Sequence, residues 1–284
     1  MSKLLFSRAS VLSLAGLFLL SIAPIGCGKD TPAPAKTPTA NTGGPATAPG
    51  GGGDGGGEVA AGAAEGVPGT ATISGKVTFK GTAPKNARIE IPAAHGECAK
   101  QHPDPLFEQA YVVGDDGGFE WVFVYVLKGD GVIGKKWAIP TAPVVLDQHG
   151  CMYEPHVFGV MAGQEIQVKN SDPVMHNIHA QPQKSAEFNE SQNPGAPVMK
   201  ETLKKAEVFV SIKCDVHNWM HACAGVVAHP YYAVTDAKGS YSIDKLPPGK
   251  YTIRAKHEKI EKPIDKEIEV KADGKVTLDF EFTK

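Results

Sequence analysis

The sequence lacks both a strong charge imbalance and the common catalytic motifs. Its 284 residues include 29 Lys and Arg and 31 Asp and Glu, which gives a formal net charge of −2. That value is too near neutral for a nucleic-acid binder or a polybasic membrane-surface protein, so we expect no nucleic-acid partner. A nucleophile elbow, a phosphate-binding loop and a paired-carboxylate motif are all missing. The sequence therefore predicts no catalytic residues and a protein that is not an enzyme.

Cysteine is scarce, and the first of the five closes an export signal. Lys3 and Arg8 form a short positive region, residues 11–25 are largely apolar, and a small residue precedes Cys27. The stretch is short for a membrane span. It resembles the lipobox of bacterial lipoproteins, in which the cysteine receives lipid, although Pro24 stands where such motifs carry Leu. We therefore expect a protein exported to the periplasmic or cell-surface side and anchored to a membrane by lipid on Cys27. The alternative is an ordinary signal with that cysteine unmodified.

Large apolar side chains are almost missing from the segment that follows the signal, residues 27–70. It consists mostly of Gly, Pro, Ala and Thr, with a glycine-rich run at 50–57. Such a segment cannot bury enough surface to offset the entropy lost on ordering it. We expect a flexible tether that lets an anchored domain reach a partner.

The rest of the chain has no sustained helical period and alternates as strands do. Residues 207–214 place Val208, Val210 and Ile212 on one face, and residues 164–170 alternate in the same way. Residues 119–127 are apolar on both faces, which predicts a strand between layers or at a domain contact. Short strands separated by Gly, Pro, Asn and Asp favour an all-β fold built from β-sandwiches.

Two segments far apart in the sequence are similar to one known module. Residues 233–255 predict strand, turn, strand, a Pro-Pro-Gly turn and another strand, and they resemble the transthyretin-like, or carboxypeptidase regulatory-like, domains. Residues 73–79 look like the first strand of the same module. This suggests that the chain between about 80 and 228 is inserted into one small sandwich. The resemblance implies a structural role for the module.

The strongest chemical motif is Cys214-x2-His217-x2-Met220, which directly follows a predicted strand. A thiolate and an imidazole bind copper strongly, and a thioether adds a weak axial bond. A short loop leaving one strand can bend these three donors around one ion. His176, directly after another alternating strand, can supply the fourth donor.

The segment His176-Asn177-Ile178-His179, together with the Cys214 loop, resembles the cupredoxins, the small blue copper proteins, and among them the amicyanins. The resemblance covers roughly residues 160–229 and implies a Greek-key sandwich. It also implies one type 1 copper ion held by His176, Cys214, His217 and Met220. Asn177 would link the two ligand loops.

By the same resemblance, the protein would transfer single electrons between redox partner proteins and would be monomeric. The edge of the His217 ring would serve as the electron port, with Trp219 shielding the copper or widening the surface patch around that edge.

Several residues near these motifs leave alternatives open. His179 competes with His176 as a ligand, and His221 is either an exposed side chain or part of a weaker second metal site. We expect Cys223 to be a buried free thiol, and the alternative is a disulfide between Cys223 and Cys214. Cys98 and Cys151 are the natural disulfide pair of an exported protein. A second Cys/His metal site is the rival, because His102 and His156 follow them.

The sequence thus predicts four parts and two rival functions. The parts are a signal peptide at 1–26, a tether at 27–70, a cupredoxin-like copper domain at 71–228 and a transthyretin-like domain at 229–284. In an alternative division, the first strand at 71–80 is shared with the C-terminal module. One rival function is a copper chaperone or store, although a closed set of four ligands favours a retained redox centre. The other is a structural or carbohydrate-binding surface protein, for which residues 119–125 would have to expose their aromatic side chains.

Overall fold

The computed structural model describes residues 63–284. The expected signal peptide, the lipid site at Cys27 and most of the tether lie outside these residues. No helix within the described part is long and apolar enough to cross a membrane. The named helical segments of that part are short, η1 (Ala93–His95) and α1 (Gly96–Lys100).

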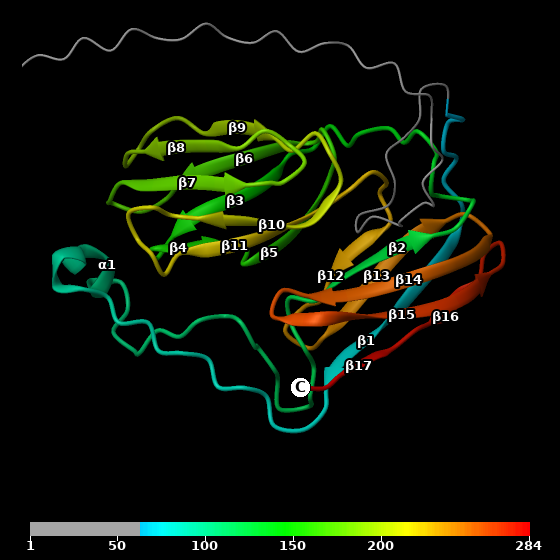
Figure 1. Ribbon diagram of the computed structural model, residues 1–284, viewed down its shortest axis with the longest axis horizontal. Helices are drawn as coiled ribbons and strands as arrows, with labels where there is room; N and C mark the ends of the chain where they lie inside the picture. The colour runs from blue at the N-terminus through cyan, green and yellow to red at the C-terminus, as the bar shows by residue number, and fades with distance from the viewer. Residues whose placement is uncertain (1–62) are drawn as a thin grey trace, which may run out of the picture. The chain divides into compact units, whose positions relative to one another are not determined.

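Nine strands in two sheets form the first sandwich, as Figure 1 shows. One sheet has the order β4-β3-β6-β9, from β3 (Val144–His149), β4 (Met152–Glu154), β6 (Glu165–Asn170) and β9 (Met199–Thr202). The other has the order β5-β11-β10-β7-β8, from β5 (Val157–Met161), β7 (His176–Gln181), β8 (Phe188–Gln192), β10 (Glu207–Lys213) and β11 (His221–Val227). A hydrophobic core that includes Leu146, Ile166, Val210 and Ile212 contains residues from both sheets.

The second sandwich combines strands from both ends of the described chain. One sheet holds β1 (Ala71–Phe79), β13 (Ser240–Leu246), β16 (Lys275–Thr277) and β17 (Phe280–Phe282). The other has the order β12-β2-β14-β15, from β2 (Phe123–Lys128), β12 (Tyr232–Val234), β14 (Gly249–His257) and β15 (Ile260–Val270). The predicted all-β class is confirmed, and so are the alternating strands β6 and β10.

Strand pairing cuts across the expected domain boundaries. β1 pairs antiparallel with β13 and parallel with β16 and β17, and β2 pairs with β12 and β14. Both early strands therefore complete the sheets of the C-terminal module. The pairing of β1 agrees with the expectation that residues 73–79 form the first strand of the C-terminal module. The expected insertion of residues 80–228 is not continuous, because β2 lies within that range and also belongs to the second sandwich.

β2 contributes its two faces to two different cores. Val124 and Val126 pack into the core of the second sandwich, whereas Phe123 and Tyr125 pack with Val208 and Val227. The predicted position at a domain contact is confirmed. Phe123 and Tyr125 have no exposed surface, so β2 offers no aromatic face to a carbohydrate. Before the strand, Phe119 is also fully buried and Trp121 is half-buried.

The end of the expected tether is part of the folded structure. The backbone N–H of Gly66 donates to the carbonyl of Lys136, and that of Gly69 donates to the carbonyl of Lys245. These contacts use backbone groups and need no large apolar side chain, which is why composition alone misassigned residues 64–69.

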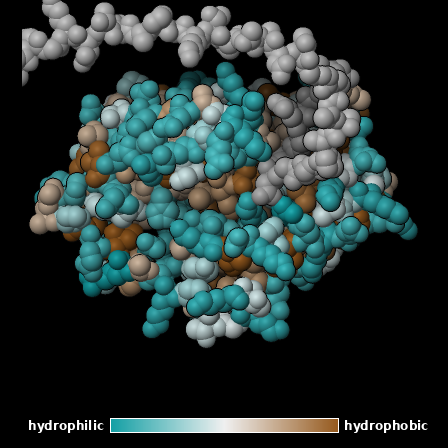
Figure 2. Space-filling model, viewed as in Figure 1, coloured by the Kyte–Doolittle hydropathy of each residue, from teal (hydrophilic) through white to brown (hydrophobic). Residues whose placement is uncertain are grey.

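Figure 2 shows a face on which hydrophilic residues dominate and hydrophobic ones lie in separated patches.

His229 is buried in its neutral form, which makes the fold sensitive to acid. Its Nδ1 accepts from the N–H of Tyr231 at 3.3 Å, and its Nε2 lies 2.9 Å from the carbonyl of Val126. Burial lowers the pKa of His229 from 6.5 to about 4. The unfolded chain therefore binds the extra proton first as the pH falls, and the stability of the folded state falls with it.

We expect the free energy of unfolding to drop between about pH 6.5 and pH 4, with His229 contributing up to roughly 3 kcal/mol. Urea unfolding at pH 7 and pH 4.5 measures the drop. His229→Gln, which can still donate to Val126, should make the drop smaller, whereas His149→Gln on the surface should not. An equal drop in the parent and in His229→Gln would show that other groups cause the acid sensitivity.

Candidate metal centre

Three strong metal donors meet at one end of the first sandwich. His176 begins β7, Cys214 directly follows β10, and His217 lies in the loop between β10 and β11. The Nδ1 atoms of the two histidines are 2.9 Å apart, and Nδ1 of His217 is 3.7 Å from Sγ of Cys214. One donor atom from each of the three lies within 4.8 Å of the others. All three side chains are buried.

The loop after β10 is closed by its own backbone. The N–H of Cys214 donates to the carbonyl of Met220 at 3.1 Å, and the N–H of Met220 donates to the carbonyl of His217 at 2.9 Å. The N–H of His217 lies 3.4 Å from Sγ of Cys214. Met220 has no exposed surface and belongs to the same core as Cys214. The spacing of the motif therefore gives a tight turn that brings Cys214 and His217 together.

Asn177 links the two ligand loops, as its resemblance to the cupredoxin residue implied. Its side-chain oxygen accepts from the N–H of Asp215 at 3.1 Å, and its amide group donates to Oδ1 of Asn189. Asp215 follows Cys214 directly, so this bond fixes the start of one loop against the strand that carries His176.

The site favours an ionised thiol. Burial opposes ionisation of Cys214, but hydrogen bonds from the His176 and His217 side chains and from the backbone of His217 and Asn177 outweigh it and lower the thiol pKa to about 5. Cys214 is therefore a thiolate at neutral pH, which is the form that binds metals. A thiolate and two imidazoles around one point fit a copper ion.

Asp172 holds the His176 ring and was not predicted from the sequence. Its Oδ2 lies 2.7 Å from Nε2 of His176, and its carboxylate accepts from the N–H groups of Gly150 and Cys151. Burial disfavours the ionised carboxylate of Asp172 and the protonated imidazole of His176. The contact nevertheless raises the pKa of His176 and, with the two backbone bonds, lowers that of Asp172. The contact leaves Nδ1 of His176 facing the other donors.

We expect Asp172→Asn to weaken copper binding by about 10- to 100-fold, the usual effect of losing a partner that orients a metal-binding histidine. An amide can accept with one oxygen only, so it cannot satisfy His176 and two N–H groups as the carboxylate does. Competition titration against a chelator measures the change. Asp147→Asn removes a nearby carboxylate that pairs with Lys169, and it should leave the affinity unchanged. Equal affinities for the two variants would contradict this role for Asp172.

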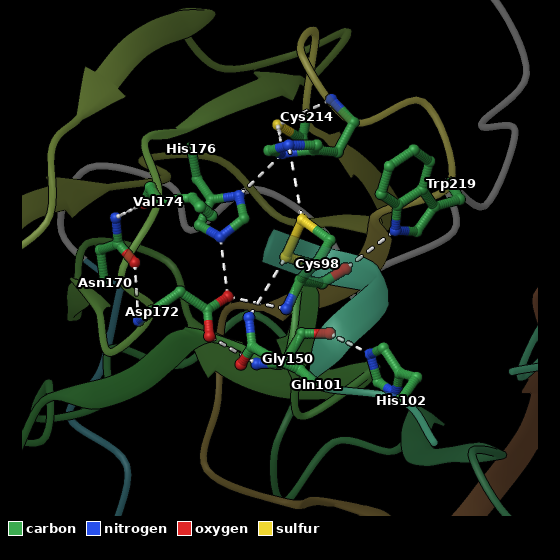
Figure 3. The surroundings of a disulfide bond; sticks show 12 residues. Cys98, Gln101, His102, Gly150, Asn170, Asp172, Val174, His176, Cys214 and Trp219 are labelled. Carbon is green, nitrogen blue, oxygen red and sulfur yellow. Dashed lines mark hydrogen bonds and ion pairs between the residues drawn. A yellow bond between two sulfur atoms is a disulfide. The ribbon is translucent and has the colours of Figure 1, made fainter. Parts of the chain in front are cut away.

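A disulfide and two aromatic rings cover His217. Cys98 and Cys151 form the disulfide, as predicted, and Sγ of Cys98 lies 3.7 Å from Nε2 of His217. The rings of His95 and Trp219 lie 4.8 and 5.1 Å from the His217 ring, centre to centre. Figure 3 shows the disulfide with Asp172, His176, Cys214 and Trp219 around it.

One sequence prediction is wrong because of this cover, and one alternative left open by the sequence is excluded. His217 is only 3% exposed, so the edge of its ring cannot be an electron port at the surface. A metal site built on Cys98 and Cys151 is excluded because their sulfur atoms are joined, and His102 instead contacts the carbonyl of Gly150. The η1–α1 segment causes both outcomes, since it carries Cys98 and His95 over the site.

The remaining candidates lie outside the three-donor cluster. His179 is not a member, because its two nitrogens face Asp215 and Glu187 at 2.8 and 2.6 Å. Cys214 and Cys223 are free and buried, so the bridge between them is excluded. His221 is not the exposed side chain expected by default, since its Nε2 atom is buried and has no hydrogen-bond partner.

The fold and the site together define an all-β protein that carries a buried thiolate–imidazole cluster at the end of one of its two sandwiches. Within it, residues 224–283 match the model of the carboxypeptidase regulatory-like domain. No curated protein matches the sequence.

Several solved structures are similar to part of the chain. A Cu-containing nitrite reductase from Thermus scotoductus is 18% identical over 31% of this chain and 23% of its own, with a TM-score of 0.28. A purple cupredoxin from Nitrosopumilus maritimus is 19% identical over 29% of this chain and 98% of its own, with a TM-score of 0.25. The amicyanin of Paracoccus versutus is 19% identical over 31% of this chain and 84% of its own, with a TM-score of 0.27. This chain thus spans about a quarter of the reductase.

Proposed function

We propose that His176, Cys214, His217 and Met220 bind one type 1 copper ion and that the protein transfers single electrons. The observation that carries this proposal is the convergence of a buried thiolate and two imidazoles on one point. A copper ion there would supply exchange between Cu(II) and Cu(I). The protein would act as a carrier between redox partners and not as an enzyme.

The surroundings of the cluster favour a retained ion over one that is handed on. A chaperone or store presents an open site, whereas His176, Cys214 and His217 are each no more than 3% exposed. Asp172 and Asn177 fix the ligand loops by hydrogen bonds, and the disulfide covers His217. A site held in this way changes little when its charge changes, which suits rapid electron exchange.

We further propose that the protein works in an exported, lipid-anchored state. The disulfide between Cys98 and Cys151 supports an oxidising compartment. Anchoring through Cys27 is tested by mass measurement of the mature protein, which should carry lipid on its first residue and lose it in Cys27→Ala.

The central test is to add Cu(II) to the purified protein and record its visible spectrum and voltammogram. We expect one equivalent of copper, an intense thiolate-to-copper band and a reversible one-electron wave. A colourless protein that binds only Cu(I) would instead support the chaperone or store. Absence of any copper binding at micromolar concentration would overturn the proposal.

A further inference from the structure

A second group of metal-binding side chains lies apart from the copper ligands. His156 stands between β4 and β5, His221 begins β11, and Glu258 follows β14. One donor atom from each lies within 4.8 Å of the others. His156 is 2% exposed, and the side chain of Glu258 is 6% exposed. The group therefore joins the first sandwich to the turn between β14 and β15 of the second.

Backbone carbonyls orient both histidines in the same way. Nδ1 of His156 lies 3.3 Å from the carbonyl of His221, and Nδ1 of His221 lies 3.1 Å from the carbonyl of Trp219. A carbonyl can only accept, so each Nδ1 carries the hydrogen and each Nε2 is free to bind. Metal-binding histidines are commonly held by this arrangement.

The ion pair between His156 and Glu258 accounts for the contacts of only two of the three side chains. Nε2 of His156 lies 2.6 Å from Oε1 of Glu258, a contact that a protonated imidazole would satisfy. That pair leaves Nε2 of His221 buried without a hydrogen-bond partner. A cation held between the three side chains would be bound by Nε2 of both histidines and by a carboxylate oxygen of Glu258.

We propose that His156, His221 and Glu258 form a second metal site, for a divalent transition-metal ion. Two imidazole nitrogens and one carboxylate oxygen suit Zn(II) or another borderline ion, with a position left for water or a further ligand. The buried thiol of Cys223 contacts Glu258, with Sγ 3.6 Å from Oε2, but it lies outside the group of three donors. The site does not depend on copper binding by Cys214.

Zinc titration of the Cys214→Ser variant tests the second site without the thiolate of the first, and substitutions at His221 and Glu258 assign the bound ion to the second site. Equilibrium dialysis followed by metal analysis should give one bound Zn(II) per chain. In the same background His221→Asn and Glu258→Gln should each weaken zinc binding by at least about tenfold. His149→Asn, which removes an exposed histidine 3.5 Å from Glu154, should not.

Thermal unfolding gives a second readout that needs no further variant, since an ion that binds only the folded state raises the melting temperature. Failure of Zn(II) to bind at micromolar concentration, with no rise in melting temperature, would overturn the site. Unchanged affinity in both His221→Asn and Glu258→Gln would overturn it as well. Because zinc binding is measured without the Cys214 thiolate, failure here is distinct from failure of the copper proposal.

Discussion

Cys214→Ser should abolish the intense visible band of the copper-loaded protein. The thiolate is the only sulfur anion in the cluster, and its pKa of about 5 keeps it ionised at neutral pH. A serine hydroxyl stays protonated under the same conditions and cannot give a thiolate-to-copper transition. Copper affinity should fall by more than the roughly 10- to 100-fold expected when only an orienting partner is lost.

The matched control for this change is Cys223→Ser. Cys223 is the other free cysteine of the described chain, and it is also buried. Burial and the nearby Glu258 raise its thiol pKa, so it stays protonated. The band should survive in Cys223→Ser. A band that persists in Cys214→Ser, or that depends on Cys223, would place the thiolate ligand elsewhere. Circular dichroism checks that both variants are folded.

Removal of the disulfide should destabilise the protein and open the site at the same time. Cys98 and Cys151 are 53 residues apart in sequence. The chain-entropy treatment gives about 4 kcal/mol for a closed loop of this length. We expect the double variant Cys98→Ala with Cys151→Ala to lose a free energy of unfolding of about that size, measured by urea unfolding without metal.

The same variant should make Cys214 more reactive. Cys214 is already ionised at neutral pH, so its rate of alkylation depends mainly on access. Sγ of Cys98 lies against His217, and the N–H of the Trp219 ring donates to the carbonyl of Cys151 at 3.0 Å. Loss of the bridge loosens both contacts. An alkylation rate equal to that of the parent would show that the disulfide does not control access to the site.

Local patterns were enough to predict the turn from Cys214 to Met220 and several strands. The alternation of Val210 and Ile212 places one face of β10 in the core of the first sandwich, and this face leads directly to Cys214, whereas Val208 packs with Phe123 and Tyr125. The spacing of Cys214 and His217 fits one turn, which the backbone hydrogen bonds then close. These features depend on residues that are close together in the sequence, so local sequence patterns can predict them.

Contacts between distant segments could not be predicted in the same way. Asp172 belongs to a polar loop whose composition only suggests a turn, and its role depends on where Gly150 and Cys151 lie. The cover over His217 depends on a segment more than a hundred residues earlier in the chain. A half-buried histidine with one buried, unpartnered nitrogen, such as His221, looks the same in the sequence as an exposed one.

The position of β1 has a consequence for how the protein is made. Its residues leave the ribosome long before its partners β13, β16 and β17, which come from the last part of the chain. Closing so long a loop is slow compared with forming contacts between neighbours. The second sandwich can therefore be completed only once residues 275–282 are available, whereas the strands of the first sandwich all precede residue 228 and can pair earlier. A chain that stops before residue 275 should leave β1 with two unpaired stretches of edge, a surface prone to aggregation.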